Sequence, residues 1–575
     1  MKILGVSGAV GHDPSAALVV DGRTVACAEE ERFVRVKHAK DIQPALSVRY
    51  CLAAGGVDPR DVDAVAYPFV RVGFLDRGRW HYARRHLYSP DRAFKAVFNP
   101  NRRYRKNLRN VTRMLAEIGI DLSRTRLVTV PHHLAHASSA YHLSGFEEAA
   151  ILSVDGVGEY ATTWLGEGRS GRLERIREFY APDSLGGFYG AMTEYLGFEM
   201  LDGEFKVMGM APYGDPSRAD ISQLLRYGPE GFELDTRFVN CLGVRRWHDE
   251  DGRGRFFSKS LPELLGASPR VGDEIDEPYV HIAAAVQKAL EEAVLGLVRR
   301  FLGPAIERTG RLCLAGGVAL NVKMNQRLLA ESGARELYVQ PAAGDAGTSL
   351  GAATYLAWQN GERLEPMRHV YLGPEYSDEE IEVALAKRSH SFRREDSITA
   401  SIARLLADGK VVAWFQGRME FGPRALGNRS ILANPAIPGV ANEVNARIKY
   451  RERWRPFCPS LLDDAAREIL GSDHPAPFMV LSFAVTPEWR FRIPEVVHVD
   501  GTVRPQVVSR DTNPRYHELL TRFRELTGVP VLLNTSLNRR GEPMVMSPDH
   551  ALDMFEGSGL EVLAMGDYLV TKSAP

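Results

Sequence analysis

The chain has 575 residues, of which 44% are hydrophobic and 25% charged, and its formal net charge is −1. This length suggests two or more domains, and the composition is ordinary for a soluble globular protein. The near-zero charge gives no global argument for binding to nucleic acid or to a membrane surface. No uncharged apolar stretch approaches the ~20 residues that span a bilayer, and no secretory signal pattern is present.

The cysteines are scattered, odd in number and without CxxC spacing. This pattern argues against a disulfide framework and against a thiolate zinc site. A reducing cytoplasm is therefore the expected compartment. The five are Cys27, Cys51, Cys241, Cys313 and Cys458.

The first 30 residues predict a β hairpin unit. Short apolar runs at 3–8 and 15–20 are joined by a Gly-rich turn, and Asp21-Gly22 signals a hairpin before a return strand at 24–28. This order resembles the opening of the actin, hexokinase and Hsp70 superfamily, in which the first hairpin approaches nucleotide phosphates. Many α/β proteins begin similarly, so the signal alone is weak.

A second such unit is predicted where a strand at 149–154 enters the turn at Asp155-Gly156 and a β-like pattern resumes. Two strand–loop–strand units suggest a duplicated α/β unit. A third strand, 312–315, leads into Gly316-Gly317 and a helical stretch from Val318. The run 281–302 has helical spacing of apolar residues and predicts a core helix.

Residues 82–113 carry ten Lys and Arg residues, one acid and interleaved aromatic residues. This mixture can indicate a nucleic-acid surface. A solvated helical insertion that helps to hold an anionic ligand is the favoured interpretation, because the rest of the chain is not basic. The Gly- and Pro-containing stretch 361–377, between predicted helices at 347–359 and 378–388, indicates a domain boundary.

The strongest local motif is His132-His133-Leu134-Ala135-His136 after a proline. His132 and His136 share one helix face, a spacing that lets two imidazoles hold one divalent metal. Asp155 and Asp345 lie in Gly-flanked turns and are candidate carboxylate ligands. Such a set suits iron(II), manganese or zinc, and the alternative is a pair of packed or capping histidines.

Two further sets of residues indicate anion binding. Gly316, Gly317 and Asn321 follow a buried-type strand, where a helix N-terminus would favour phosphate. Loops at 417–430, 448–457 and 534–541 concentrate arginines among Gly, Pro and aromatic residues, which suits a nucleoside triphosphate with carbamoyl phosphate. No P-loop motif is present.

Together the motifs resemble the NodU/CmcH carbamoyltransferase family, which includes antibiotic-tailoring enzymes. They occur in the family's order from Gly11 to Pro543. The motifs are GHDPSAA, HHLAH, VDGVGE, GEFKVMGMAPYG, AGGVALN, AAGDAGTSLGAA, GRMEFGPRALGNRSIL, KYRERWRPFCPS and LNTSLNRRGEP.

The resemblance implies a two-domain α/β fold. Residues 1–362 would form an ASKHA-type duplicated α/β domain resembling the tRNA threonylcarbamoyl transferase subunit, and 363–575 a YrdC-like α/β domain. The implied reaction is ATP-dependent O-carbamoyl transfer. The C-terminal domain would hydrolyse carbamoyl phosphate to carbamate and join it to ATP, with Mg, as carbamoyl-AMP. The N-terminal domain would pass the carbamoyl group to a natural-product hydroxyl of the antibiotic type.

The resemblance also assigns residues. His132, His136, Asp155 and Asp345 would hold the metal, expected to be Fe(II), and His12 would act as general base or contact the adenylate. Lys206, Gly316, Gly317 and Asn321 would lie by the nucleotide in the N-terminal domain. Lys449 and Arg504 are expected to act catalytically within a C-terminal set that binds ATP and carbamoyl phosphate: Arg418, Arg424, Lys449, Arg451, Arg455, Arg504, Asn534 and Arg540.

Two other functions compete with this interpretation. One is a tRNA threonylcarbamoyl-type modification enzyme, and the other a non-enzymatic ASKHA ATP-binding scaffold. The expected partner is a small-molecule hydroxyl acceptor, with no nucleic acid and no membrane. The sequence leaves open the acceptor's identity, the metal, and the oligomeric state, with a homodimer as one option.

Overall fold

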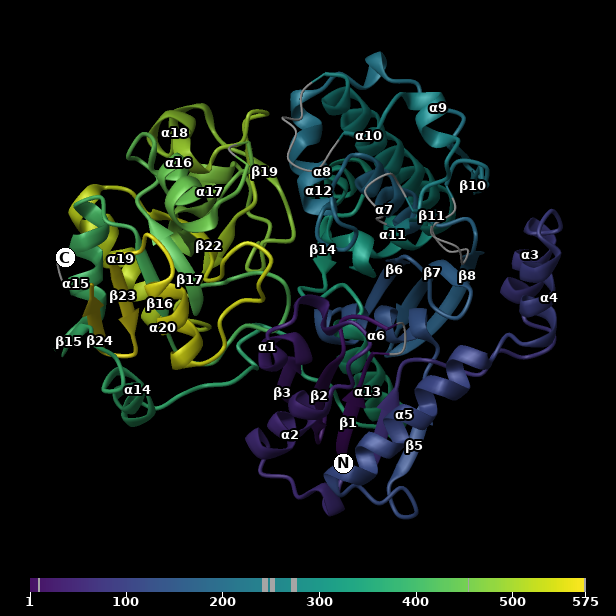
Figure 1. The fold of residues 1–575 in the computed structure, drawn as a ribbon, viewed down its shortest axis with the longest axis horizontal. Coiled ribbons are helices and arrows are strands. Elements are labelled where there is room, and N and C mark those ends of the chain that lie inside the picture. Colours follow the sequence, from purple (N-terminus) through teal and green to yellow (C-terminus); the bar gives the residue numbers. More distant parts are fainter. Residues whose placement is uncertain (9–10, 240–246, 249–253, 270–276, 453, 573–575) are drawn as a thin grey trace. The chain divides into compact units, whose positions relative to one another are not determined.

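The computed structural model describes residues 1–8, 11–239, 247–248, 254–269, 277–452 and 454–572 (Figure 1). The fold is mixed α/β with several sheets, and the chain forms two compact units. The first unit contains residues 1–11, 17–24 and 57–366, and the second contains 12–16, 25–56 and 367–575. Two N-terminal segments are thus grouped with the C-terminal part of the chain.

The first sheet has the strand order β3-β2-β1-β4-β5, with β1, β4 and β5 parallel. Its inner strands consist of buried apolar residues, as expected for a sheet covered on both faces. Their bounds are β1 Lys2–Val6, β2 Ser15–Val20, β3 Arg23–Glu29, β4 Ala64–Tyr67 and β5 Arg126–Thr129.

The second sheet repeats this arrangement in the order β8-β7-β6-β13-β14. Three strands that follow one another in the chain are antiparallel neighbours, and two later strands extend the sheet in parallel. The shared strand order is what a duplicated α/β unit produces. The bounds are β6 Glu148–Val154, β7 Ala161–Arg169, β8 Arg172–Tyr180, β13 Arg311–Ala315 and β14 Glu336–Val339.

Helices α6 (His132–Ser144) and α13 (Gly347–Gln359) pack against each other and against these sheets. One face of α6 packs on the second sheet in a core that includes Tyr141, Ile151 and Trp164. Helix α13 packs on β1, where Gly5 is required because a Cβ would come 1.9 Å from the Ser349 carbonyl oxygen. The predicted helix at 347–359 is confirmed.

The remaining helices of the first unit show one confirmed prediction and one error. The helix predicted at 281–302 is α10, Tyr279–Leu297, continued by a π-helical turn, Val298–Leu302. The helix predicted from Val318 instead begins after Asn321, because the Asn321 side chain caps the N-terminus by accepting from the Met324 amide. The others are α7 Leu185–Tyr195, α8 Glu204–Met210, α9 Leu261–Leu265, α11 Gly303–Thr309 and α12 Val322–Glu331.

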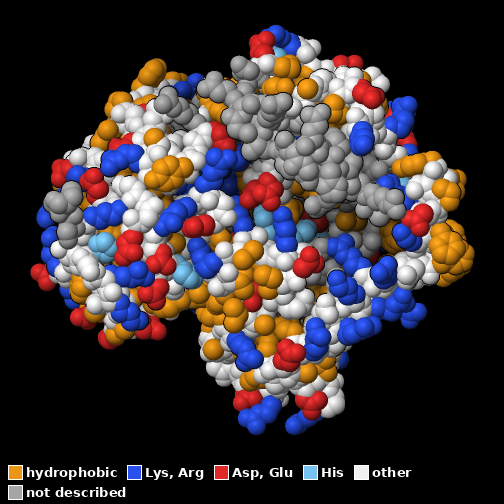
Figure 2. All heavy atoms as spheres, viewed as in Figure 1, with side chains coloured by type: hydrophobic (Ala, Val, Ile, Leu, Met, Phe, Trp, Pro, Cys, Tyr) orange, Lys and Arg blue, Asp and Glu red, His pale blue; other side chains and the backbone are white. Residues whose placement is uncertain are grey.

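The basic segment is helical, as predicted. It forms α3 (Arg77–Arg85), α4 (Pro90–Phe98) and α5 (Arg102–Ile118). Figure 2 shows Lys and Arg side chains gathered over α5, and hydrophobic side chains exposed where α3 and α4 lie. Two small hairpins complete the unit: β9 Leu225–Gly228 with β10 Gly231–Leu234, and β11 Trp247–His248 with β12 Gly254–Arg255.

The second unit is built on an eight-stranded sheet with the order β15-β24-β23-β16-β17-β22-β18-β21. The pairing is mostly antiparallel, with parallel neighbours at β16–β23 and β18–β21. The strands are β15 Ser391–Arg394, β16 Val412–Phe415, β17 Arg429–Ala433, β18 Cys458–Leu462, β21 Gln506–Val508, β22 Val531–Ser536, β23 Val562–Met565 and β24 Tyr568–Thr571, and a separate pair is β19 Phe483–Ala484 with β20 Thr502–Val503.

Helices from both ends of the chain belong to this unit. The predicted helix at 378–388 is present as α14, opened by a capping box at Ser377 and Glu380. The helices are α1 Glu30–Val34, α2 Ala45–Ala54, α14 Asp378–Leu385, α15 Ile398–Ala407, α16 Val440–Val444, α17 Ala466–Leu470, α18 Pro487–Arg492, α19 Pro514–Thr527 and α20 Pro548–Glu556.

Cys27, Cys51, Cys313 and Cys458 are buried and free of disulfides, and Cys241 lies outside the described residues. Arg453, a member of one arginine motif, also lies outside them. Within the described part of the chain, no helix is both long enough and apolar enough to cross a membrane.

Candidate metal centre and cation cluster

Two imidazoles and two carboxylates converge in the first unit. The Nε2 atoms of His132 and His136 lie 3.2 Å apart. Asp155 Oδ2 is 3.3 Å from His132 Nε2 and 3.8 Å from His136 Nε2. Asp345 Oδ1 is 3.4 Å and 3.5 Å from the same two nitrogens. All four side chains are buried. These are the four residues that the sequence predicted as ligands.

Local structure explains the convergence. His132 and His136 are one turn apart on α6, so their rings point to the same side. Asp155 directly follows β6, and its Oδ1 accepts from the Gly317 amide at 2.8 Å, which fixes the carboxylate. Gly158 can approach α6 because it lacks a side chain, since a Cβ would come 2.8 Å from the His132 Cβ.

The electrostatics of the cluster are those of tightly coupled opposite charges. Burial alone would lower the pKa of His132, but the Asp155 and Asp345 carboxylates outweigh it and raise that pKa well above its usual value. The pKa values of Asp155 and Asp345 are lowered despite burial, because both carboxylates face imidazoles. His133 takes no part, since its Nδ1 lies 2.8 Å from Ser153 Oγ.

The four atoms fit a divalent metal. Bonds of ~2.1 Å in a tetrahedron place neighbouring ligand atoms ~3.4 Å apart, close to the separations of 3.2–3.8 Å found here. Two nitrogen and two oxygen donors suit iron, manganese or zinc.

The residues predicted to lie by a nucleotide in the first unit have protein partners. Gly316 adopts φ +88°, and a Cβ there would come 2.1 Å from the Val154 carbonyl oxygen, so its conformation serves close packing on β6. Asn321 exchanges two hydrogen bonds with Gln287, at 2.9 and 3.0 Å. Lys206 Nζ lies 5.0 Å from the Phe198 ring. Gly316 and Gly317 therefore border the His/Asp cluster, whereas Asn321 caps α12.

A second histidine arrangement occurs in the second unit. Asp13 Oδ2 is 2.9 Å from His12 Nδ1, and Asp13 Oδ1 is 2.8 Å from His38 Nδ1. Burial would raise the pKa of Asp13, but its hydrogen bonds to the two imidazoles lower it. Asp13 and His38 both have positive φ, of 49° and 59°, a strained conformation that is enriched at functional sites.

Asp13 and His38 are not among the residues predicted from the sequence. Asp13 stood beside His12 in the first-loop motif, but His38 lies 25 residues away and carries no local signal. Asp13, Glu31 and His38 also bring three potential ligand atoms together. Glu31 is already engaged there by the His38 amide at 2.7 Å and by the Arg32 guanidinium at 2.9 Å.

Several predicted cations gather in the second unit. Burial and the neighbouring Arg504 and Arg455 lower the pKa of Arg424 well below its usual value. Burial and Arg455 lower the pKa of Arg451 to about 9. Burial lowers the pKa of Lys449 too, with Arg451 and Arg455 adding to the effect. We call Arg424, Lys449, Arg451, Arg455 and Arg504 the cation cluster.

Specific contacts hold members of this cluster in place. Lys449 Nζ donates to the carbonyls of Ser536 and Asn538 at 2.8 and 3.0 Å. Arg504 directs Nε and one terminal nitrogen at the Cys458 sulfur, at 3.1 and 2.9 Å. Lys449 is buried and the four arginines are partly buried. Positive charge concentrated in this way is costly unless an anion compensates it, so the cation cluster is a candidate phosphate site.

The other predicted polar residues of the second unit are bonded to protein. Arg418 donates to the carbonyls of Val25, Leu372 and Gly373. Asn534 donates to Ser460 Oγ at 2.9 Å. Arg540 lies 3.7 Å from Glu452, which is also 3.8 Å from Arg455. The structure therefore gives Arg418 and Asn534 a clear architectural role.

Comparisons with known proteins cover both units. The family models described as Carbamoyltransferase N-terminus and Carbamoyltransferase C-terminus match residues 2–354 and 403–572. An uncharacterized protein of Synechocystis sp. is 37% identical over 100% of this chain and 97% of its own length.

Two relatives have names that refer to nodulation. Nodulation protein NolNO of Sinorhizobium fredii is 38% identical over 98% of this chain and 79% of its own length. Nodulation protein U of Bradyrhizobium diazoefficiens is 30% identical over 94% of this chain and 92% of its own length. The similarity therefore extends through both the His/Asp cluster and the cation cluster.

Proposed function

Because this chain belongs to the carbamoyltransferase family, of the NodU/CmcH type, we propose that it is an ATP-dependent O-carbamoyltransferase. The observation that carries the proposal is that one unit holds a His/Asp cluster and the other holds a partly buried cation cluster. The first suits a metal-assisted acyl transfer and the second suits binding of phosphates. We also propose an ASKHA-type architecture for residues 1–362, which the repeated sheet order supports, and a YrdC-like architecture for 363–575.

In this proposal the cation cluster forms carbamoyl-AMP. Water hydrolyses carbamoyl phosphate to carbamate and inorganic phosphate. A carbamate oxygen then attacks the α-phosphorus of ATP, with Mg, and pyrophosphate leaves. Guanidinium groups bind phosphate oxygens in a bidentate way, which supports roles for Arg424, Arg451, Arg455 and Arg504. Lys449 would contribute from a position fixed by its bonds to the Ser536 and Asn538 carbonyls. Arg540, which shares Glu452 with Arg455, would complete the nucleotide site from its border, whereas Arg418 and Asn534 would support it through their bonds to protein.

The His/Asp cluster is the proposed metal centre, with iron(II) as the expected ion. A metal bound there would polarise the carbamoyl carbonyl and offset charge on the departing phosphate. The chain's own contribution is to hold the four metal-ligating side chains in place before a metal binds. Gly317 orients Asp155, and helix α6 fixes the two histidines.

His12 is the proposed general base for transfer. The acceptor oxygen attacks the carbamoyl carbon, the bond from that carbon to the adenylate oxygen breaks, and AMP leaves with the electron pair. The hydroxyl proton passes to a ring nitrogen of His12. Because Asp13 is hydrogen-bonded to Nδ1, Nε2 is the nitrogen that would accept the proton.

Incubation of the protein with ATP and carbamoyl phosphate tests the first half of this function. We expect AMP and pyrophosphate to form only when carbamoyl phosphate is present. A panel of polyhydroxylated natural products then tests the second half, with a mass gain of one carbamoyl group as the readout. Absence of carbamoyl-phosphate-dependent AMP formation with iron(II), manganese, zinc and magnesium supplied in turn would refute the proposal.

A further inference from the structure

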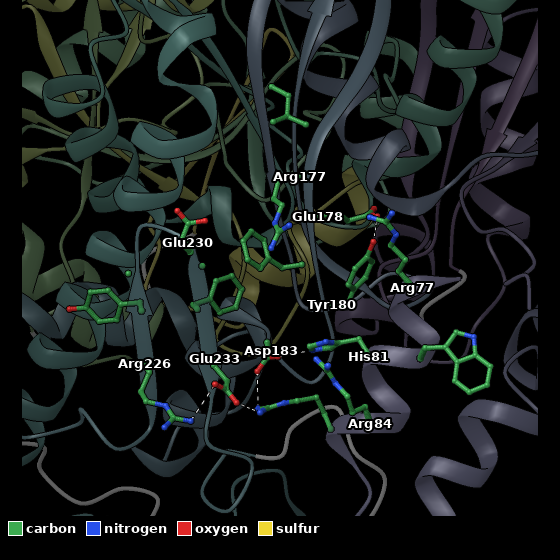
Figure 3. A pocket seen from close by; sticks show the side chains of 18 of the residues that line it. Arg77, His81, Arg84, Arg177, Glu178, Tyr180, Asp183, Arg226, Glu230 and Glu233 are labelled. Atoms are coloured by element: carbon green, nitrogen blue, oxygen red, sulfur yellow. Dashed lines mark hydrogen bonds and ion pairs between the residues drawn. The ribbon is translucent and has the colours of Figure 1, made fainter. Parts of the chain in front are cut away.

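A pocket of about 1180 Å³ opens in the first unit, and it contains none of the residues assigned above. Its walls come from α3, from β8 and from the β9–β10 hairpin (Figure 3). Typical small-molecule pockets have volumes of ~300–1,000 Å³, so this one can take a ligand larger than a single sugar ring.

The deepest side chains of the pocket form an ion-pair network. Asp183 lies 2.8 Å from His81 Nε2 and 3.1 Å from Arg85, and it accepts from the Leu234 amide at 2.9 Å. Glu233 pairs with Arg85 and lies 3.3 Å from Arg226. Figure 3 shows Asp183 beside His81, and Arg226 pointing toward Glu233. The network joins three elements, and each of its two carboxylates, Asp183 and Glu233, faces basic side chains.

Three arginines of the pocket wall do not belong to this ion-pair network. Arg77, Arg84 and Arg177 line the pocket, and in the part of the chain that the structure describes they form no ion pair with a carboxylate. The Arg177 guanidinium lies 5.2 Å from the centre of the Phe179 ring, which restrains its direction. Their positive charge is available to an oxyanion, which guanidinium groups bind through paired hydrogen bonds.

Aromatic rings supply the apolar part of the lining. Trp80 and Tyr227 remain 41% and 42% exposed, and Phe179 packs on Phe232 with ring centres 5.1 Å apart. Exposed aromatic faces beside guanidinium groups suit a ligand that has flat or ring-shaped apolar faces together with negative charge.

Hydrogen bonds link one wall of the pocket to a loop of the proposed metal centre. Asp183, at its base, is followed by Ser184, whose hydroxyl donates to the carbonyls of Asp155 and Gly156 at 3.4 and 2.7 Å. The Asp183 carbonyl also accepts from Thr162 at 2.7 Å. One wall of the pocket is therefore bonded to the loop that carries a proposed ligand.

We propose that this pocket binds the carbamoyl acceptor, and that the acceptor carries an oxyanion, a carboxylate or a phosphate, beside its ring system. The inference rests on the proposed function, because it assigns the substrate class of that reaction. It excludes polycationic acceptors, since the uncompensated charge of the wall is positive.

A binding experiment with matched fluorescent probes tests this. The probes are 4-methylumbelliferyl glucuronide, the 6-phosphate of 4-methylumbelliferyl glucoside, and the neutral glucoside itself. Fluorescence polarisation reports binding, and the variants described below distinguish binding in the pocket from binding at the cation cluster. We expect one or both anionic probes to bind at least about tenfold more tightly than the glucoside, and the two arms show which oxyanion is preferred.

Arg84→Ala combined with Arg177→Ala should reduce that preference to less than about twofold. Arg109→Ala removes an exposed arginine of α5 outside the pocket, and it should leave the preference unchanged. Equal binding of the three probes, failure of all three to bind, or a preference that survives in the double variant would overturn the proposal. AMP formation measured in the same proteins separates this outcome from failure of the proposed function, because that step does not use the pocket.

Discussion

The ring nitrogens of His132 and His136 are the atoms on which the proposed metal centre depends most directly. With His136→Ala we expect bound metal to fall from about one equivalent to less than about a tenth, because loss of a ligand exceeds the ~10–100-fold effects of outer contacts. Elemental analysis of the purified protein measures this. His142→Gln is the matched control, since His142 is a buried histidine of α6 that contacts Ser138 and Gly171. Equal metal contents in the two variants would contradict the assignment.

Arg451 allows a residue-scale test of the cation cluster. Its pKa of about 9 means that the folded protein disfavours the charge, so replacing it with an apolar residue should stabilise the fold. We expect Arg451→Met to raise the unfolding free energy by about 1 kcal/mol at pH 7 while AMP formation falls at least about a hundredfold.

The stability gained by Arg451→Met should depend on pH, because the pKa of Arg451 is lowered in the folded protein. The pKa of Arg451 is lower in the folded protein than in the unfolded chain. The free-energy cost of its charge in the folded protein is therefore complete below pH 9 and decreases as the pH rises through about 9. The advantage of Arg451→Met should therefore shrink between pH 8 and pH 10, as measured by thermal unfolding. An advantage that grows over this range would show that the guanidinium is stabilising.

At the scale of elements, the contact of α13 with α6 positions the histidines. Gly351 lies against the Ala135 carbonyl, and a Cβ would come 1.9 Å from that oxygen. Gly→Ala in a helix usually stabilises by up to ~1 kcal/mol. We expect Gly351→Ala to destabilise by ~2 kcal/mol or more, and to lower metal content. Gly296→Ala in α10 is the control, because no atom lies within 4 Å of its added Cβ, and denaturant unfolding compares the two.

Elements with a local signature were predicted well. The strand at 15–20 and the helices at 281–302 and 347–359 follow from apolar runs and helical spacing, which depend on neighbouring residues. Helix α12 begins later than predicted, because Asn321 caps its N-terminus and the Gly316-Gly317 turn does not open it. A short 3₁₀ turn intervenes, at Gly317–Leu320.

The candidate sites also contain contacts that the sequence predicts and contacts that it does not. His132 and His136 could be paired from sequence because one helical turn brings them together. The contact of Asp13 with His38 could not, because it depends on a loop with positive φ that places distant residues side by side. The pocket was also missed, since its walls come from three elements that share no motif.

At the scale of the whole molecule, the second unit depends on residues far from it in sequence. Gly422 donates to Glu29 at 2.8 Å, Arg32 donates to the Gly422 carbonyl at 3.0 Å, and Arg35 donates to the Pro543 carbonyl at 2.8 Å. A fragment of residues 363–575 would leave these partners unpaired and uncover apolar surface.

We therefore expect fragment 363–575 to be insoluble or to unfold at least about 10 °C below the full chain, as followed by circular dichroism. Addition of a peptide spanning residues 12–56 should recover part of that loss. A fragment that unfolds at the full chain's temperature would show that the N-terminal segments contribute nothing to the second unit.

This division of the chain also sets an order of events during synthesis. Residues 12–16 and 25–56 leave the ribosome early, yet the remainder of their unit begins at Met367. At ~5–20 residues per second, helices α1 and α2 would wait roughly 15–60 s for their partners. During that interval their apolar faces are open to chaperones, so the yield of active protein should depend on translation speed through the intervening codons.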